Sequence, residues 1–318
     1  MPLLGLCLYP MNCNLVSGQT LCIILYHTFL LNKSFLPLHI SQMSPVIHCV
    51  RHGQGFHNVG AGCYTLPDPR LTPLGEEQNM ALRKTAFSDQ SKISLILASP
   101  LCRTLQSAYL LFQPALTASN KCHPEIIAIP DAQETSDDPC DVGTDPSDLC
   151  RVVAESKWPV HLTLVKDGWN VKALGTRYSP ESNAIAARAR DVRIFIRQKI
   201  RQLIEQGDTD PQVALVTHGG FLHYLTDDWE DSWLNPGTGW QNCETRSYVF
   251  KQDVMDDIDV EAGLTETMDS RLRRGKGNPM PAREEQAVLF EQAMENWENQ
   301  GLQRPDRIGL DLETSVIA

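Results

Sequence analysis

Short apolar runs alternate along the chain with longer segments in which apolar residues recur every three or four positions. Nearly continuous runs of Val, Ile, Leu and Ala lie at 46–50, 93–98, 125–129 and 213–216, with a fifth candidate at 248–250. Continuous runs of this length are typical of strands that are buried on both faces. Strands that alternate with helices predict an α/β fold with a largely parallel sheet, covered on both sides.

The sequence indicates where the predicted helices begin and which of their residues face the sheet. Thr72 is a candidate N-cap with Pro73 at the first helical position, a combination that favours a helix start. We expect the inner face of this helix to carry Leu74, Ala81, Leu82 and Phe87. A second helix follows the 93–98 strand, and a long third helix spans 181–206, both with apolar residues at helical spacing.

Two regions differ from this α/β pattern, and they set the predicted domain boundaries. Residues 1–42 are rich in Leu, Cys and aromatic residues and contain a single basic residue, Lys33. Their apolar run at 15–31 is interrupted by polar residues, whereas a membrane span needs about 20 mostly apolar residues. We expect 1–42 to be an extension outside the fold; a signal or anchor segment and a packed element are the alternatives.

The main domain is then expected at 43–252, and 253–318 reads as an acidic, partly helical C-terminal tail. From Lys251 onward the chain carries 15 acidic and 8 basic residues, and a polar helix is expected near 282–298. Such a composition favours loose packing or partial disorder. Residues 131–148, rich in Asp, Pro and Thr, predict a surface loop.

Composition narrows the class of protein. The net charge of −11 argues against a nucleic-acid-binding protein, which is normally basic. The ten cysteines are scattered, with no Cys-x-x-Cys pair and an odd number, seven, from Cys49 onward. This pattern indicates reduced thiols in a cytoplasmic protein. No stable membrane insertion is expected, and the oligomeric state is not predicted.

Polar and cationic residues follow three of the predicted strands directly. These segments are Arg51-His52-Gly53, Ser99-Pro100-Leu101-Cys102-Arg103 and Thr217-His218-Gly219-Gly220. Ligands of open α/β sheets bind outside the carboxyl ends of the strands, so we expect a compact cationic pocket there. Gly219 would let the backbone approach an anion, and a following helix N-terminus would add N–H donors.

This set of side chains suits a phosphoryl group. The guanidinium forks of Arg51 and Arg103 match phosphate oxygens. A neutral His52 can attack phosphorus, and a protonated His218 can stabilise the transferring charge. The leaving oxygen also needs a proton donor; Glu134 is our candidate and Asp137 the alternate.

A metal site is the competing interpretation of the histidines. His48, His52 and His57 are separated by four and five residues across a strand and a turn. That spacing does not put three nitrogens on one face, and no His-Glu-x-x-His segment is present. We therefore expect no metal and no cofactor.

The motifs together resemble the histidine phosphatase superfamily, also called phosphoglycerate-mutase-like. The resemblance runs over about 46–250 and rests on four ordered segments: 50–58, Leu71-Thr72-Pro73-Leu74-Gly75, Ser99-Pro100 with Arg103-Thr104, and Thr217-His218-Gly219-Gly220. It implies a three-layer α/β/α sandwich, a phosphorylated His52, phosphate held by Arg51, Asn58, Arg103 and His218, and no metal requirement. Within the superfamily, Arg-His-Gly-Gln-Gly paired with Gln-Glu-x-x-Asp is similar to fungal proteins of the phosphoglycerate mutase family.

Some residues depart from the family pattern. Mutases of this family usually carry Ser or Thr where this chain has Gly55, and an Arg-His-Tyr-Gly segment where Thr135 to Asp138 follow Glu134. The acid-phosphatase branch carries Arg-x-Pro after Arg-His-Gly, which is replaced here by Gln54-Gly55-Phe56. We therefore expect a phosphatase acting on a small phosphorylated substrate. A phosphoglycerate-type mutase and a non-catalytic phosphate-binding module are the alternatives.

Overall fold

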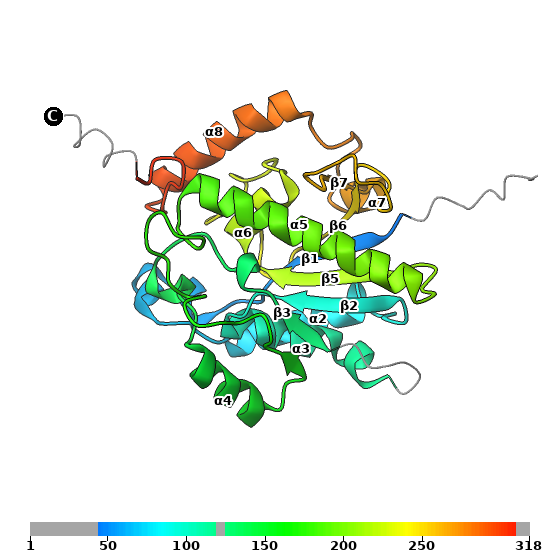
Figure 1. Cartoon of the computed structure of the whole chain (residues 1–318). Helices are drawn as coiled ribbons and strands as arrows, with labels where there is room; N and C mark the ends of the chain where they lie inside the picture. The colour runs from blue at the N-terminus through cyan, green and yellow to red at the C-terminus, as the bar shows by residue number, and fades with distance from the viewer. Residues whose placement is uncertain (1–43, 119–124, 310–318) are drawn as a thin grey trace, which may run out of the picture. The chain divides into compact units, whose positions relative to one another are not determined.

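The computed structural model describes residues 44–118 and 125–309. The expected extension at 1–42 lies outside these residues. A seven-stranded sheet with the order β4-β3-β2-β5-β1-β6-β7 forms the centre of the described part (Figure 1). Its strands are β1 (Val46–Arg51), β2 (Ile93–Ala98), β3 (Ile126–Ala128), β4 (Val160–His161), β5 (Gln212–Thr217), β6 (Thr245–Phe250) and β7 (Leu264–Glu266).

The sheet is parallel from β4 to β1, and β6 and β7 are antiparallel additions at one edge. All five apolar runs in the sequence form strands, as predicted. The two strands without a predicted counterpart, β4 and β7, contain two and three residues.

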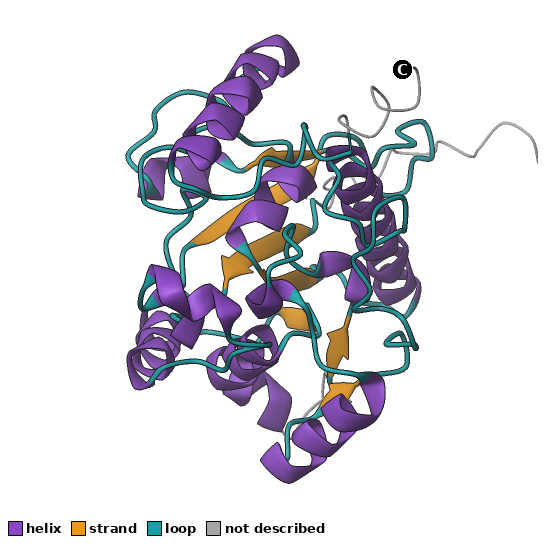
Figure 2. Ribbon diagram, turned by 90° about the vertical axis from the view of Figure 1, so that its left-hand side faces the viewer, coloured by secondary structure: helices purple, strands orange, loops and turns teal. Residues whose placement is uncertain are grey.

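Helices cover both faces of the sheet (Figure 2). On one face, α2 (Pro73–Thr85), α3 (Cys102–Thr117) and α4 (Pro146–Ser156) pack over a core that includes Val50, Ile96 and Leu105. On the other, α5 (Ser182–Glu205), α6 (Gly219–Thr226) and α8 (Arg283–Asn299) enclose a second core with Ile47, Ile196 and Phe221. The short helix α7 (Met268–Arg273) follows β7. The expected three-layer α/β/α sandwich is confirmed.

Helix α2 starts as predicted but buries a different face. The Thr72 hydroxyl accepts a hydrogen bond from the Gly75 N–H at 3.0 Å. Leu74 is 50 % exposed and Ala81 is also exposed, so the expected apolar inner face is wrong for both residues. The buried residues are Gly75 and Asn79, because this face packs on the turn after β1. Within α2 itself, the buried Asn79 amide donates to the Gly75 carbonyl at 2.8 Å.

The C-terminal tail is not loosely packed, which corrects the expectation for residues 254–309. Strand β7 pairs with β6, and the side chains of Ala293, Met294 and Trp297 on α8 are buried in the sheet's core. The described residues from 44 to 309 belong to one compact unit, so no separate tail begins at 253 within them. The composition of α8 is polar on average, yet one narrow stripe of it is apolar, and that stripe is sufficient for docking.

The 131–148 segment is also more buried than a surface loop. It contains the 3₁₀ helices η3 (Pro130–Ala132) and η4 (Pro139–Asp141) and leads into α4. Several of its polar groups have partners inside the molecule: the Gln133 amide N–H donates to the Trp169 carbonyl at 2.8 Å, and Lys172 Nζ donates to the Glu134 carbonyl at 2.7 Å. Because buried polar groups need partners, these bonds permit an Asp-rich segment to lie inside the molecule. We call residues 133–141 the acidic loop.

Candidate active site

The three predicted strand-end motifs meet at one edge of the sheet. Strand β5 lies between β1 and β2, and all three run parallel. The carboxyl ends of these strands therefore place His52, Arg103 and His218 together. The ring centroids of His52 and His218 are 5.2 Å apart, and Arg103 Nε lies 3.3 Å from His52 Nε2.

His52 is buried and its ring is oriented by two contacts. Nδ1 lies 2.6 Å from the Gly53 carbonyl, to which it donates a proton, and Nε2 faces the Arg103 Nε–H at 3.3 Å. A donor at Nε2 fixes the tautomer, because only the unprotonated nitrogen can accept. Burial, followed by the charges of Arg103 and Arg51, holds the pKa of His52 well below its ordinary value. The side chain is therefore a neutral imidazole with its lone pair on Nε2.

Arg103 is the charged centre of this cluster and is fully buried. Its guanidinium donates to the Cys140 carbonyl at 2.6 Å and to Asp141 Oδ1 at 2.8 Å. Breaking a buried pair of this kind is strongly destabilising, so the acidic loop and α3 are held together through Arg103. The pair also fixes the guanidinium beside both histidines.

His218 is fully buried as well, and its charge state differs from the expectation. Nδ1 lies 3.2 Å from Arg103 Nη2, a donor, and Nε2 lies 2.9 Å from the Ser99 hydroxyl. Burial and the Arg103 charge hold the pKa of His218 well below its ordinary value. The expected imidazolium is therefore wrong for this pocket as it stands; the neutral ring accepts from Arg103.

Arg51 is the last residue of β1, and Asn58 lies in the turn that follows this strand. Arg51 Nη1 donates to the Trp240 carbonyl, and its buried Nε has no protein partner. Asn58 Oδ1 accepts from the Gly55 N–H at 3.0 Å, which leaves the amide Nδ2 as a donor. Both residues line the same cavity as His52.

Gly219 begins α6 beside Arg51, and its missing side chain is a packing requirement. A Cβ on Gly219 would lie 2.1 Å from Thr238 Oγ1 and 3.4 Å from Arg51 Nε. Gly219 thus permits Thr238 and Arg51 to approach the start of α6. Gly219 does not itself line the cavity.

The two candidate acids are placed differently. Glu134 lines the cavity, and its carboxylate accepts from the Gly220 and Phe221 N–H groups at 3.2 and 2.9 Å. Burial, with the charge of Asp141, raises the pKa of Glu134 above its ordinary value, although the N–H donors oppose this. Asp137 is exposed, bonds to Gln303 and does not line the cavity. The geometry therefore favours Glu134 as the proton donor.

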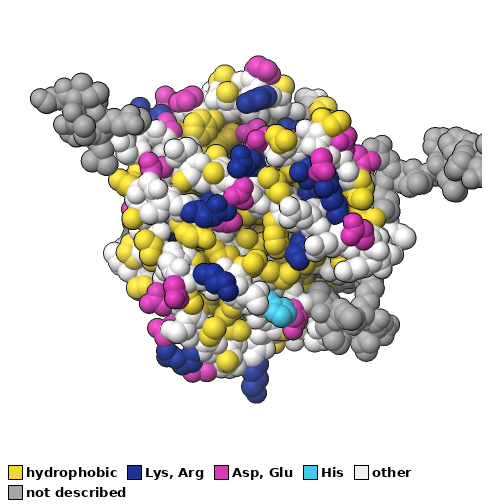
Figure 3. Space-filling model, viewed as in Figure 1, with side chains coloured by type: hydrophobic (Ala, Val, Ile, Leu, Met, Phe, Trp, Pro, Cys, Tyr) yellow, Lys and Arg dark blue, Asp and Glu magenta, His cyan; other side chains and the backbone are white. Residues whose placement is uncertain are grey.

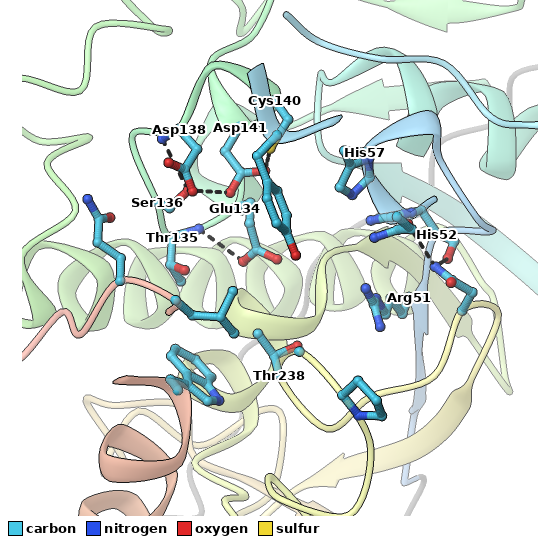
Figure 4. Close-up of a pocket in the computed structure, with 18 residues that line it drawn as sticks. Arg51, His52, His57, Glu134, Thr135, Ser136, Asp138, Cys140, Asp141 and Thr238 are labelled. Carbon is cyan, nitrogen blue, oxygen red and sulfur yellow. Dashed lines mark hydrogen bonds between the residues drawn. The ribbon is translucent and has the colours of Figure 1, made fainter. Parts of the chain in front are cut away.

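A cavity of about 290 Å³ lies beside these residues, although Arg103, His218 and Asp137 do not line it. In Figure 4, Arg51, His52 and His57 lie on one side of it, and Glu134, Asp138 and Asp141 lie on the other. Its remaining lining residues are Asn58, Tyr64, Thr135, Ser136, Cys140, Pro236, Gly237, Thr238, Asn242, Trp297, Leu302 and Gln303. The cavity thus combines a cationic, nitrogen-rich end with an acidic wall.

The N-terminal part of this domain matches a known family. Residues 47–124 match the model of the histidine phosphatase superfamily, branch 1, and this range contains Arg51, His52, Asn58 and Arg103. Over this range the chain is similar to the histidine phosphatase superfamily.

The chain is also similar to several named proteins. A phosphoglycerate mutase-like protein of Arabidopsis thaliana is 26 % identical over 76 % of this chain and 96 % of its own length. A probable phosphatase of Schizosaccharomyces pombe is 34 % identical over 32 % of this chain and 47 % of its own. Among solved structures, the ecdysone phosphate phosphatase from Bombix mori aligns with a TM-score of 0.44 and 15 % identity, covering 68 % of this chain and 95 % of that one.

The sequence did not identify several residues that line the cavity. His57 is 6 % exposed and its ring centroid is 5.4 Å from that of His52. Burial and the two arginines lower the pKa of His57 to about 2, so it too is neutral. His57 precedes Asn58 in the turn after β1, a position that could have drawn attention to it. Thr238, Trp297 and Gln303 come from distant segments with no local signal.

In 44–118 and 125–309, no group of three or more His, Cys, Asp or Glu side chains is arranged to hold a metal ion. No helix in this part of the chain is long and apolar enough to cross a membrane. On the face in Figure 3, acidic and basic side chains are interspersed among apolar ones.

Proposed function

We propose that this chain is a phosphatase that hydrolyses a phosphate monoester through a covalent phosphohistidine on His52. The observation that carries the proposal is the state of His52, which is neutral and oriented, with an unprotonated Nε2 that accepts a hydrogen bond from Arg103. An imidazole in this form is a nucleophile, and a guanidinium beside it can bind the phosphoryl oxygens.

In the first step, the lone pair of His52 Nε2 attacks phosphorus and the bond from phosphorus to the ester oxygen breaks. Arg51 and Asn58, together with Arg103 once its N–H releases His52 Nε2, donate N–H groups to the phosphoryl oxygens, which stabilises the charge that they carry in the transition state. Glu134 gives its proton to the leaving oxygen, so the product departs as a neutral alcohol. The raised pKa of Glu134 supports this role, because it keeps the carboxyl group protonated at a higher pH.

In the second step, water attacks the phosphohistidine. The Glu134 carboxylate accepts a proton from this water, the bond between phosphorus and Nε2 breaks, and inorganic phosphate leaves. His218 acts in both steps by accepting from Arg103 and so holding the guanidinium in place. When a phosphate dianion binds, its charge favours the protonated form of His218, which would then add a further donor.

Hydrolysis is proposed over mutase chemistry because of the acidic wall. Asp138 and Asp141 line the cavity with Glu134, and these carboxylates repel a substrate that carries its own carboxylate. A glycerate phosphate would have to place that group near them. Water is then the acceptor of the phosphoryl group.

The proposal is tested by trapping the intermediate. Protein mixed with p-nitrophenyl phosphate is quenched in alkali, in which phosphohistidine survives, and the modified residue is mapped by mass spectrometry. We expect phosphate on His52, and one atom of ¹⁸O in each released phosphate when the reaction runs in ¹⁸O-water. Phosphate on another residue would overturn the nucleophile. Efficient interconversion of 3- and 2-phosphoglycerate with little free phosphate would indicate a mutase, and binding without turnover a non-catalytic module.

We also propose that the protein acts in the cytoplasm without a cofactor. Six cysteines of the described residues are free: Cys49, Cys63, Cys102, Cys140, Cys150 and Cys243. Free thiols are usual in reducing compartments. Fractionation of cells that express the tagged full chain tests the location, and recovery in a secretory fraction would contradict it.

A further inference from the structure

Asn242 is a second asparagine beside Asn58 in the wall of the cavity. It lies in the segment that leads into β6, 184 residues from Asn58 along the chain. Both asparagines line the same cavity as His52. The proposed reaction gives Asn58 a role and leaves Asn242 without one.

Backbone hydrogen bonds fix the position of Asn242 relative to the end of β1. The Cys243 N–H donates to the carbonyls of Arg51 and His52 at 3.1 and 3.2 Å. The Arg51 N–H in turn donates to the Glu244 carbonyl at 3.0 Å. These bonds continue the pairing of β1 with β6 beyond the two strands. A backbone that is paired in this way positions a side chain more precisely than a free loop does.

The side chain of Asn242 joins His52 to Asn58 through one nitrogen atom. Its Nδ2 donates to the His52 carbonyl at 3.2 Å and to Asn58 Oδ1 at 3.3 Å. Because a backbone carbonyl can only accept, this contact identifies which end of the Asn242 amide is the nitrogen. The two hydrogens of a single NH₂ group therefore connect the backbone of the proposed nucleophile to the side chain of a proposed phosphate-binding residue.

Two donors fix the orientation of the Asn58 amide. Oδ1 accepts from the Gly55 N–H at 3.0 Å as well as from Asn242. With the Gly55 bond alone, which lies within the same turn, the amide could rotate about its oxygen, and the donor from the distant segment removes this freedom. Among residues 44–118 and 125–309, no group accepts from Asn58 Nδ2. Nδ2 is therefore the atom with which Asn58 can bind a phosphoryl oxygen.

We infer that Asn242 is a positioning residue, which holds the Asn58 amide in a fixed place relative to His52. This inference rests on the proposed phosphatase function, in which Asn58 binds a phosphoryl oxygen and His52 Nε2 attacks phosphorus. Binding groups of an active site must stay within about 0.5 Å of the productive geometry. Without Asn242, the Asn58 amide would adopt several orientations, and phosphate would bind more weakly.

Direct contact with the substrate is the competing role for Asn242, since its own side chain lines the cavity. A direct contact acts independently of Asn58. A positioning contact, in contrast, has no effect once the Asn58 side chain has been removed. A double-mutant cycle measures this difference.

The first experiment measures the binding of inorganic phosphate by calorimetry in the wild type, Asn58→Ala, Asn242→Ala and the double variant. We expect each single change to raise Kd about tenfold, as for the loss of one hydrogen bond to a charged group. The double variant should match Asn58→Ala within about twofold. Independent losses, which multiply to about 100-fold in the double variant, would overturn the positioning role, as would an unchanged Kd in Asn242→Ala. The control Asn278→Ala, at an exposed position outside the cavity, should keep the wild-type Kd.

The fold should tolerate the loss of the Asn242 side chain, because both of its acceptors keep another donor. The His52 carbonyl still accepts from the Cys243 N–H, and Asn58 Oδ1 still accepts from the Gly55 N–H. Asn242→Leu is a second variant that removes the donor and keeps a similar volume. It should raise Kd as much as Asn242→Ala does, and a folded Asn242→Leu protein with the wild-type Kd would contradict the inference.

The second experiment compares the same proteins in the hydrolysis of p-nitrophenyl phosphate. We expect Asn242→Ala to lower kcat/KM about tenfold when Asn58 is present, and less than about twofold when Asn58 is alanine. If the wild type is active and the two losses are independent, the inference fails and the phosphatase function stands. If the wild type binds phosphate with the expected coupling but hydrolyses no ester, the phosphatase function fails, whereas the positioning of Asn58 stands. A wild type that neither binds phosphate nor hydrolyses any ester would overturn both.

Discussion

His52 is kept reactive by contacts that act on opposite sides of its ring. The Gly53 carbonyl accepts a hydrogen bond from Nδ1–H, and Arg103 Nε–H donates one to Nε2. The low pKa that burial and the arginines impose means that the ring stays neutral even in acid. The proposed nucleophile is therefore neutral, while the arginines proposed to bind phosphate beside it are cationic.

Replacing the nucleophile should abolish turnover and leave the fold intact. We expect His52→Ala to lower kcat by at least about 10³-fold, or roughly 4 kcal/mol, because the covalent route is lost. The melting temperature should change little, since the side chain ends a strand within a polar cluster. His161→Ala, at a half-exposed position on β4, is the control. A folded His52→Ala protein with near-normal activity would exclude His52 as the nucleophile.

The pH dependence should be set by His52 and Glu134. His52 must be neutral, and because its pKa is lowered, activity persists below pH 6.5. Glu134 must be protonated, and because its pKa is raised above 4.5, activity falls on the alkaline side only as pH passes this higher value. We therefore expect an optimum of kcat/KM on the acidic side of neutral, measured with an alkyl phosphate.

The variant Glu134→Gln tests whether Glu134 causes the fall in activity at alkaline pH. It should lower kcat for an alkyl phosphate by about 10²–10⁴-fold. The activity that remains should no longer fall as the pH rises. The loss should be much smaller for p-nitrophenyl phosphate, because its leaving group needs no proton. If Asp137→Asn produces this pattern and Glu134→Gln does not, the acid has been assigned to the wrong residue.

The residues of the site could be predicted from sequence where they follow strands. His52, Arg103 and His218 each come directly after a buried apolar run, so their meeting follows from the parallel sheet. The charge of His218 could not be predicted, because it depends on burial and on the position of Arg103. Trp297 and Gln303 gave no signal, since only the folded chain brings them to the cavity.

Helices and strands could be predicted where their apolar pattern extends over enough residues to be recognised in the sequence. Runs of about five apolar residues indicated β1, β2 and β5, and an apolar stripe over six turns indicated α5. Strands β4 and β7 are too short to produce a pattern. The packing of α8 was hidden because its few buried residues are diluted by charged ones.

The packing of α8 predicts a large effect of a mutation in it. Met294 is fully buried and lies outside the cavity lining. We expect Met294→Ala to lower the free energy of unfolding by about 2–5 kcal/mol, measured by denaturant titration. Val288→Ala on the same helix, at a position that is 57 % exposed, should change it by less than about 0.5 kcal/mol. Equal, small effects of both changes would mean that α8 is only loosely attached.

For the whole molecule, the described sheet is complete without residues 1–42. All of its strands lie between Val46 and Glu266, and no described edge requires another strand for the cavity to form. A chain that begins at Met43 should therefore be folded, with a melting temperature and a kcat close to those of the full chain. Insolubility, or melting many degrees lower, would show that the first 42 residues stabilise the fold.

The position of β1 has a consequence for how the protein is made. The strand that carries the nucleophile is among the first described segments, yet its partners are β5 and β6, with Val46 opposite Gln212 and Ile47 opposite Tyr248. At 5–20 residues per second, a nascent β1 waits roughly 10–30 s for β5 to be synthesised. During this time an apolar strand with two open edges leaves the ribosome unpaired. We therefore expect the chain to depend on chaperones until translation is nearly finished, and slower translation after β1 to lower its soluble yield.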